Sequence, residues 1–227
     1  MSIRKGKFIV IDGTDGSGKA TQTQLLINAL QKENIAVKSI SFPRYGEKSC
    51  GPVEQYLSGK YGSADEVDAK VASILYAIDR YDASFEIKKD LNSGINVIAD
   101  RYVGSNLGHQ GSKIPDKQER LKFYNWNRNL EYDLLNIPKP DINIILHVPT
   151  KITLQLANKR GGWKADIATD IHETNINHLK QAEKTYLELA NLFPEFHLIE
   201  CAPNGKLLSI QSIHNKIMTI VHNLINS

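Results

Sequence analysis

The stretch FIVIDGTDGSGKATQ, residues 8–22, decides the fold of this chain. It begins with four apolar residues that suit a buried strand, and glycines, a lysine and a helical pattern follow in the order of a phosphate-binding loop, G-x-x-x-x-G-K. Gly13, Gly16 and Gly18 let the backbone turn tightly and aim N–H groups at phosphate oxygens, and Lys19 reaches the outer phosphates. The alternative, a glycine-rich turn without function, does not require all four features in this order.

The residue after Lys19 departs from the usual motif. Ala20 stands where a serine or threonine hydroxyl holds magnesium, and the side chain of Thr21 points about 100° away along a helix. Magnesium commonly keeps several waters and binds through substrate phosphates and one or two carboxylates, so a water can replace the missing hydroxyl. Asp100 supplies such a carboxylate, because it ends the apolar run INVIAD at 95–100 in the manner of an acid that orients a metal-bound water. A helix N-cap is the alternative role for Asp100.

Short apolar strands alternate with helical patterns along the chain, which indicates an α/β fold with a parallel sheet between two layers of helices. Two apolar stripes at helical spacing, within 176–193 and 210–224, are interpreted as core-facing helices. No stretch rich in proline, glycine or serine divides the chain, so we expect one domain over 1–227. The expected strands are 7–12, 36–42, 95–100, 141–148 and 196–201.

The composition argues against several other classes of protein. A net charge of +3 over 227 residues suits anionic small molecules in a local cleft better than the concentrated basic face of a nucleic-acid-binding protein. No apolar run approaches the length of a membrane span or has the form of a secretory signal. The two cysteines fit a reducing compartment. We therefore expect a soluble cytoplasmic protein with neither nucleic acid nor a membrane as partner.

The chain resembles the thymidylate kinases, P-loop nucleoside-monophosphate kinases that transfer the γ-phosphate of ATP to dTMP. The resemblance spans nearly the whole chain, and four motifs carry it: DGTDGSGKATQ at 12–22, FPRYG at 42–46, LYAIDR at 75–80 and DRYVGSNLGHQG at 100–111. The last is the most specific, since the usual form in the family is D-R-Y-x-x-S-x-x-A-x-Q-G. Here Gly108 replaces the alanine and His109 replaces a frequent tyrosine. The resemblance implies a three-layer P-loop kinase fold with a five-stranded parallel sheet, a Mg²⁺ cofactor and a homodimer.

Two arginines are expected to hold the acceptor phosphate. Arg44 follows the second strand and Arg101 follows the third, at the sheet edge where open α/β folds bind ligands. Guanidinium groups offer fork-like donors to phosphate, so the two side chains would form a clamp. The resemblance adds Arg80 to this group, for which surface ion pairs are the alternative. It also places Tyr76 where the family stacks an aromatic ring on thymine, although a half-buried core tyrosine is a rival interpretation.

The resemblance assigns the remaining site residues. Ser105 and Gln110 match residues that line the base, and Asp15 matches an acid that accepts a hydrogen bond from the deoxyribose 3′-hydroxyl. The residues expected at dTMP are Asp15, Phe42, Arg44, Tyr76, Arg80, Arg101, Ser105 and Gln110. Those expected at ATP are Gly13, Asp15, Gly16, Ser17, Gly18, Lys19, Ala20, Thr21 and Arg160.

The segment NKRGGWKADIATDIHE, residues 158–173, is expected to be a short mobile lid, with two glycines and three basic residues before a helix start. By resemblance, Arg160 lies beside the adenine. The phosphate-binding loop lacks the arginine that some family members carry there, so the lid must supply the cation that offsets charge on the transferred phosphoryl group. Lys159, Arg160 and Lys164 are the candidates. The residues expected to act in catalysis are Lys19, Arg44, Asp100, Arg101 and Arg160.

Alternatives to a thymidylate kinase remain open at this point. A deoxynucleoside kinase must deprotonate a sugar hydroxyl and needs a carboxylate just after the second strand, where this chain has Pro43 and Arg44 and no acid before Glu47. A monophosphate acceptor already presents a mostly dianionic oxygen at pH 7 and needs no general base. The sequence therefore predicts phosphorylation of dTMP, with another deoxynucleoside monophosphate as an alternative acceptor. A nucleotide-binding protein without catalysis is supported only by Ala20.

Overall fold

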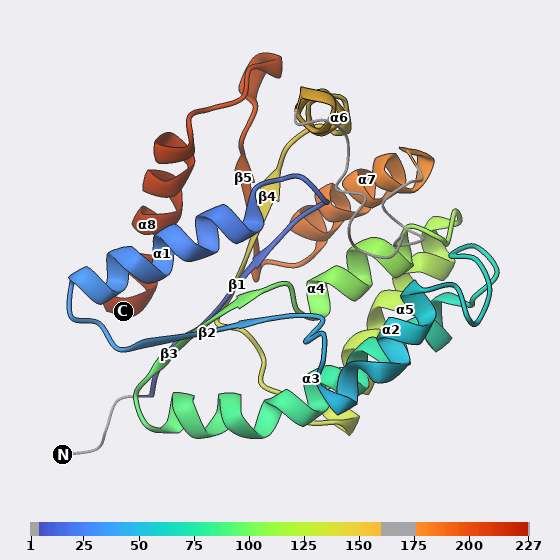
Figure 1. Cartoon of the computed structure of the whole chain (residues 1–227), viewed down its shortest axis with the longest axis horizontal. Coiled ribbons are helices and arrows are strands. Elements are labelled where there is room, and N and C mark those ends of the chain that lie inside the picture. Colours follow the sequence, from blue (N-terminus) through green and yellow to red (C-terminus); the bar gives the residue numbers. More distant parts are fainter. Residues whose placement is uncertain (1–4, 160–175, 227) are drawn as a thin grey trace.

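Five parallel strands form the centre of the molecule, in the order β2-β3-β1-β4-β5 (Figure 1). The computed structural model describes residues 5–159 and 176–226. Each of the five expected strands is present, with bounds within one residue of those expected, and the α/β fold class is confirmed. The strands are β1 (Phe8–Asp12), β2 (Val37–Ser41), β3 (Asn96–Asp100), β4 (Ile142–His147) and β5 (Phe196–Glu200).

The sheet lies between two layers of helices (Figure 1). Helices α1 (Lys19–Lys32) and α8 (Ile210–Asn226) lie side by side on one face. Helices α3 (Ala69–Asn92), α5 (Lys117–Arg128) and α7 (Ile176–Leu192) cover the other. Among the described residues, no helix is both long enough and apolar enough to cross a membrane. The remaining elements are η1 (Lys48–Cys50), α2 (Gly51–Leu57), α4 (Val103–Ser105), η2 (Asn106–Gln110), η3 (Asn129–Leu134), α6 (Thr150–Lys159) and η4 (Pro203–Gly205).

Alternate residues of β1 point into opposite layers, as the pleat of a strand requires. Phe8 and Val10 belong to the core beneath α3, α5 and α7, and Ile9 and Ile11 belong to the core beneath α1 and α8. All four side chains are fully buried. A strand covered on both faces is apolar at every position, which explains why the run FIVI identified β1 in the sequence.

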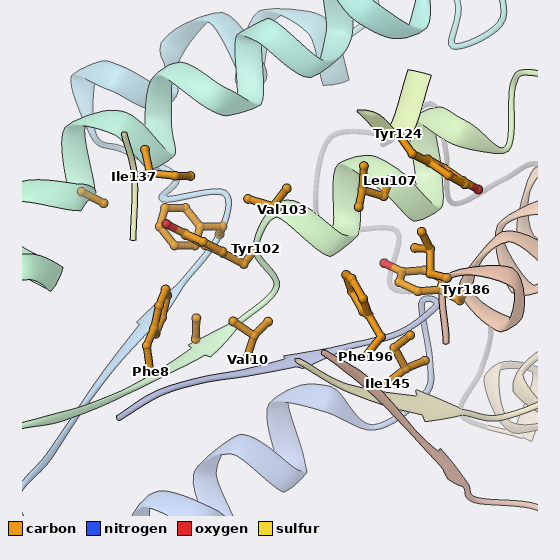
Figure 2. Packing of buried hydrophobic residues seen from close by; sticks show 14 of the residues in the cluster. Phe8, Val10, Tyr102, Val103, Leu107, Tyr124, Ile137, Ile145, Tyr186 and Phe196 are labelled. Atoms are coloured by element: carbon orange, nitrogen blue, oxygen red, sulfur yellow. The ribbon is translucent and has the colours of Figure 1, made fainter. Parts of the chain in front are cut away.

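The core beneath α3, α5 and α7 is rich in aromatic rings (Figure 2). The rings of Tyr102 and Phe8 meet edge to face with 4.9 Å between their centroids. Tyr186, from the predicted stripe of α7, belongs to the same cluster (Figure 2). Only the first residues of the two predicted stripes, Ile176 and Ile210, are exposed, and each is also the first residue of its helix. The stripes therefore face the core as predicted, apart from these two positions.

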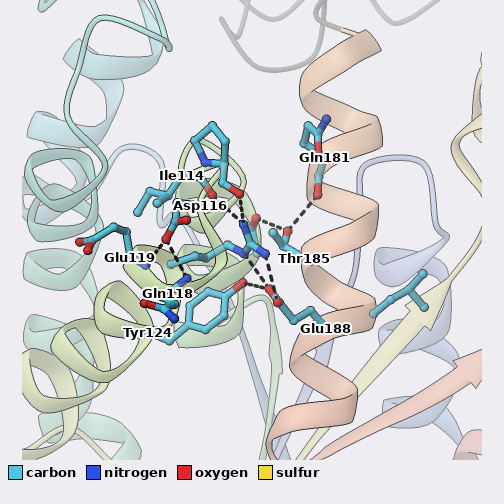
Figure 3. Close-up of polar contacts among 12 residues, drawn as sticks. Ile114, Asp116, Gln118, Glu119, Tyr124, Gln181, Thr185 and Glu188 are labelled. Atoms are coloured by element: carbon cyan, nitrogen blue, oxygen red, sulfur yellow. Dashed lines mark hydrogen bonds and ion pairs between the residues drawn. The ribbon is translucent and has the colours of Figure 1, made fainter.

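Polar contacts join α7 to α5 (Figure 3), and a further hydrogen bond joins α7 to η2. Arg120 donates hydrogen bonds to the Glu188 carboxylate through Nε at 2.7 Å and Nη2 at 3.1 Å, and the Tyr124 hydroxyl donates to the same carboxylate at 3.0 Å. The Thr185 hydroxyl donates to the carbonyl oxygen of Gly108 at 2.7 Å. Helix α7 is therefore tied to both α5 and η2, close to the carboxyl edge of the sheet.

Candidate active site

The loop between β1 and α1 has the backbone of a phosphate-binding turn. Gly13 has a φ of 139°, and a Cβ placed there would lie 2.7 Å from the carbonyl oxygen of Leu146, so only glycine fits. Gly18 has a φ of 88° and immediately precedes the first residue of α1, Lys19. The loop amides therefore lead into the N-terminal end of a helix of 14 residues, the arrangement that favours anions. This is the order of features that the sequence predicts.

A cleft of about 680 Å³ opens beside this loop, at the carboxyl ends of β1, β2 and β3. Its walls include most of the predicted site residues, and it is also lined by parts of α2 that the sequence analysis did not select. Tyr76 is half-buried in the wall, which agrees with both interpretations of its ring. The predicted residues that line the cleft are Asp15, Gly16, Gly18, Lys19, Ala20, Thr21, Phe42, Tyr76, Asp100, Arg101 and Ser105.

Asp15, Lys19 and Arg101 form a charged cluster at the centre of the cleft. Asp15 is ion-paired with Arg101, and the ammonium of Lys19 lies 3.9 Å from the same carboxylate. Burial acts to raise the pKa of Asp15, but the charges of Arg101 and Lys19 outweigh it and hold that pKa well below its usual value. Burial, together with Arg101, lowers the pKa of Lys19 to about 8 although Asp15 opposes this. Near pH 7 the cluster therefore carries two positive charges and one negative charge.

Arg101 has a constrained backbone. Its φ is 67°, in the left-handed region that residues other than glycine rarely adopt, and its N–H donates to the carbonyl oxygen of Ile11 at 2.9 Å. Its guanidinium is held by Asp15, by Ser105 Oγ at 3.5 Å and by His109 Nε2 at 3.2 Å. Both the main chain and the side chain of Arg101 are thus fixed at the sheet edge, where ligands bind in open α/β folds.

Two carboxylates at the strand ends have unpaired oxygens. Asp100 Oδ1 and Asp12 Oδ2 are buried and have no hydrogen-bond partner among the described residues. Burial raises the pKa of Asp100, while Lys19 and Arg101 act against that shift. Asp12 Oδ1 accepts three hydrogen bonds, from Gly13 N at 2.9 Å, Ser105 Oγ at 2.8 Å and the Tyr186 hydroxyl at 2.7 Å. The Asp100 carboxylate is thus available for a cation, while the Asp12 carboxylate anchors three segments of the site.

The donor set fits a magnesium ion that is held mainly by substrate and water. No three His, Cys, Asp or Glu side chains converge to hold a metal within residues 5–159 and 176–226. The unpaired oxygen of Asp100 supplies one protein acceptor at the cleft, and Ala20 supplies no hydroxyl. Magnesium accepts such a site because it keeps several waters and binds nucleotide phosphates directly.

Arg44 does not lie in the wall of the cleft, and the expected two-arginine clamp is not formed in this structure. Its Nε donates to Asp79 Oδ1 at 2.9 Å, and its Nη2 donates to Asp82 Oδ2 at 2.6 Å and to Ser49 Oγ at 2.7 Å. The reason is the position of Asp79, which lies on the buried face of α3 and requires a cation as partner.

Arg80 and Gln110 are also buried behind the wall of the cleft. The Arg80 guanidinium is 2% exposed and donates to Glu131 through Nε at 2.5 Å and Nη2 at 2.8 Å. Glu131 also accepts a hydrogen bond from Asn106 at 3.1 Å, and Asn106 does line the cleft. Arg80 therefore supports a residue of the wall through Glu131. Gln110 is 1% exposed, and its Oε1 has no partner among the described residues.

Gly108 replaces the alanine of the family motif, and a tyrosine on α7 fills the space beside it. A Cβ placed on Gly108 would lie 2.6 Å from Tyr186 Cζ, so the ring occupies the space that an alanine would need. From this position the Tyr186 hydroxyl reaches Asp12. The sequence pattern places Tyr186 only in an apolar stripe that faces the core. The glycine in place of alanine at position 108 is the signal that a large side chain lies opposite.

Other residues of the site were missed because their partners lie far away in the sequence. Asp12 could have been selected, since an acid at the end of a buried strand needs several donors. Asn106 and His109 lie within a quoted motif but were given no role. Nothing in the sequence around His178 indicates a role in the site. Arg160 and the predicted lid at 158–173 lie outside the described residues, except for Asn158 and Lys159 at the end of α6.

Comparisons with known proteins agree with this geometry. The profile of the thymidylate kinase family matches residues 11–217. The chain is 31% identical over 226 residues to a probable thymidylate kinase of Thermococcus onnurineus, with 94% of this chain and 96% of that protein covered. It is 28% identical to the thymidylate kinase of Mycobacterium tuberculosis, covering 81% and 85%, and 28% identical to that of Plasmodium falciparum, covering 95% and 89%.

A solved structure has the same fold. The thymidylate kinase of Candida albicans superposes with a TM-score of 0.76 over 98% of this chain and 93% of that one, at 22% sequence identity. At this identity the match supports the fold alone. The arrangement of five parallel strands between helices is therefore shared with a known kinase structure.

Proposed function

Because this chain belongs to the thymidylate kinase family, we propose that it transfers the γ-phosphate of ATP to dTMP, giving dTDP and ADP. One observation carries the proposal. A loop with the backbone of a phosphate-binding turn and a fixed arginine, Arg101, face the same cleft, and this supports two separate phosphate sites there. Two phosphorylated substrates in one cleft are what a nucleoside-monophosphate kinase requires.

The donor ATP is proposed to lie on the loop between β1 and α1. Its phosphates would accept hydrogen bonds from the loop amides and lie at the positive end of α1. Lys19, which now donates to the carbonyl oxygen of Thr14 at 2.9 Å, would turn to the outer phosphates. Its pKa of about 8 keeps the ammonium mostly charged at pH 7. We retain Arg160 and the predicted lid as the proposed source of a further cation over the adenine nucleotide.

The acceptor dTMP is proposed to place its phosphate at Arg101 and its ring on Tyr76. The second pKa of a phosphate monoester is near 6, so the acceptor oxygen is mostly dianionic at pH 7 and no base has to remove a proton. Catalysis then depends on alignment and on neutralisation of charge. Asp15, next to Arg101, is the proposed partner of the sugar 3′-hydroxyl. Arg44 could join Arg101 at the phosphate only after leaving Asp79 and Asp82.

Magnesium is proposed as the cofactor. Asp100 would hold it through water, and Ala20 leaves one more position for water than a serine would. When bound, the ion neutralises negative charge on the phosphates of the donor. Lys19 and Arg101 supply the remaining positive charge from this chain.

A homodimer is proposed because α3 carries an unpaired apolar stripe. Val71, Ile74, Ile78, Tyr81 and Phe85 follow one another at alternating intervals of three and four residues, and each is between 41% and 62% exposed. This is the spacing of a seam between paired helices. A second copy of this chain presents the same stripe and can cover it with twofold symmetry.

A cytoplasmic location is also proposed. The two cysteines, Cys50 and Cys201, are free and buried, as is usual in reducing compartments.

The test is the release of ADP by the purified protein with ATP and magnesium, using dTMP, dUMP, dCMP, dGMP or thymidine as acceptor. We expect turnover with dTMP well above that with the other acceptors. The Lys19→Ala variant, which lacks the proposed phosphate ligand, controls for contaminating kinases. Turnover with thymidine but not dTMP would identify a deoxynucleoside kinase, and ATP binding without turnover of any acceptor would identify an inactive nucleotide-binding protein.

A further inference from the structure

Two buried histidines form a chain of hydrogen bonds behind Arg101. Arg101 Nη1 lies 3.2 Å from His109 Nε2, His109 Nδ1 lies 3.3 Å from His178 Nε2, and His178 Nδ1 lies 3.4 Å from Ser112 Oγ. The Ser112 hydroxyl donates to the carbonyl oxygen of His109 at 2.7 Å. The chain runs from the wall of the cleft to α7, which carries His178.

The proton positions in this chain follow from its first member. A guanidinium has only donors, so His109 Nε2 must accept and His109 must be neutral, with its proton on Nδ1. That proton is donated to His178 Nε2, which therefore also accepts. The proton of His178 is then on Nδ1 and faces Ser112 Oγ, whose own proton is already directed to His109.

The fold holds the two rings in this arrangement. Only 3.3 Å separates the facing nitrogens, the ring centroids are 5.6 Å apart and the ring planes differ by 23°, so the rings meet edge to edge. His109 and His178 are 9% and 7% exposed. Helix α7 is tied to η2 through Thr185 and to α5 through Glu188 (Figure 3), which fixes the position of His178.

We propose that His178 is a positioning residue for the acceptor site: it keeps His109 in the Nδ1–H form, and His109 then holds the Arg101 guanidinium in place for the acceptor phosphate. The proposal rests on the proposed function of Arg101. It makes α7, which contributes no residue to the wall of the cleft among the described positions, part of the machinery that binds the acceptor.

The chain is sensitive to acid. A proton on His109 Nε2 would remove the acceptor that holds Arg101, and a proton on His178 Nε2 would place two N–H groups opposite each other between the rings. Within residues 5–159 and 176–226, the charged and titratable groups that face the pair include Arg101, Asp15, Lys113, Asp65 and Tyr186. Burial and the charge of Lys113 lower the pKa of His178, which favours the neutral form of that ring.

The first test needs no turnover. Long-range ¹H–¹⁵N spectra of the histidine rings, with the signals of His109 and His178 assigned from their Gln variants, report which nitrogen carries each proton. We expect both rings in the Nδ1–H form at pH 7.5. An Nε2–H form of His109 would overturn the proposal, whether or not the protein phosphorylates dTMP. If the protein fails to phosphorylate dTMP, the proposed function fails, while these spectra still decide the state of the pair.

The second test separates acceptor binding from donor binding. His178→Phe keeps the ring without its nitrogens, and we expect it to raise the KM for dTMP about tenfold while the KM for ATP stays within about twofold. His178→Gln offers an amide oxygen near Nε2 and should restore most of the loss. His222, on α8 and paired with Glu33 at 2.8 Å, provides the control variant His222→Gln.

The pH dependence gives the third readout. The KM of the wild type for dTMP should rise between pH 7.5 and pH 5.5 more steeply than that of His178→Gln, because only the wild type has a ring at position 178 that can take up a proton. The titration of dTMP itself is the same in both assays and does not affect the comparison. The proposal is supported if the spectra show both rings in the Nδ1–H form, if His178→Phe raises the KM for dTMP but not that for ATP, and if His178→Gln restores most of the loss. An unchanged KM for dTMP in a folded His178→Phe protein, or equal acid responses of wild type and His178→Gln, would overturn it.

Discussion

At the scale of single residues, two arginines that are equivalent in the sequence pattern differ in the structure. Arg101 lines the cleft, whereas Arg44 donates to Asp79, whose side chain is 1% exposed. We expect Arg101→Ala to lower kcat/KM for dTMP by about 10²–10³-fold, the usual cost of removing a donor to developing charge. We expect Arg44→Ala to lower kcat/KM far less and to cost about 3 kcal/mol of unfolding free energy, since the Asp79 charge is left buried. Steady-state kinetics and denaturant unfolding measure the two effects.

The double variant Arg44→Ala/Asp79→Asn is the control for the stability effect. It removes the unpaired charge together with its partner, so it should recover part of the lost unfolding free energy. If Arg44→Ala instead kept the stability of the wild type and lost as much kcat/KM as Arg101→Ala, Arg44 would be a phosphate ligand as the sequence pattern predicts.

At the scale of elements, the contact between η2 and α7 depends on the absence of a side chain at Gly108. A methyl group there would lie 2.6 Å from Tyr186 Cζ and would displace the ring whose hydroxyl reaches Asp12. Overpacking of this kind costs about 1–3 kcal/mol. We therefore expect Gly108→Ala to lower the Tm by about 2–10 °C, measured by calorimetry.

Gly51 provides a matched control. A Cβ at Gly51, in the first turn of α2, would meet nothing within 4 Å, so Gly51→Ala should leave the Tm unchanged or slightly higher. Combining Gly108→Ala with Tyr186→Ala should cost less than the sum of the two single changes, because they share one contact. Additive losses would show that the ring does not respond to the residue at position 108.

At the scale of the whole molecule, the exposed stripe on α3 predicts how two copies assemble. Phe85, which is 62% exposed, packs edge to face with Tyr81 at 5.3 Å between ring centroids, so the two form one apolar surface. We expect the protein to sediment as a dimer. Phe85→Glu should shift it to a monomer, because a second copy would bring two like charges into an apolar seam. Analytical ultracentrifugation over a range of concentrations measures the change.

Leu134→Glu is the control for that experiment. Leu134 is 74% exposed at the end of η3 and is not part of the stripe on α3, so a charge there should leave the dimer intact. A wild-type protein that sediments as a monomer at all concentrations would contradict the proposed homodimer. Dissociation of both variants would place the interface on another surface.

The sequence by itself determined the parallel α/β fold, the family and the position of the phosphate-binding loop. These properties depend on residues that are neighbours in the chain. A strand buried on both faces is a continuous apolar run, and a loop that binds phosphate needs glycines and a lysine at fixed intervals. The five strands were therefore predicted to within one residue, and most of the predicted site residues line one cleft.

Only the tertiary structure decided which way the long polar side chains point. Arg44 turns to Asp79, 35 positions away, and His109 meets His178, 69 positions away. Tyr186 reaches Asp12 across 174 positions. Such partners are chosen by the packing of α3 and α7 on the sheet, because a buried charge or donor must find whichever group that packing brings within about 3 Å. No local pattern in the chain identifies which residue supplies each partner.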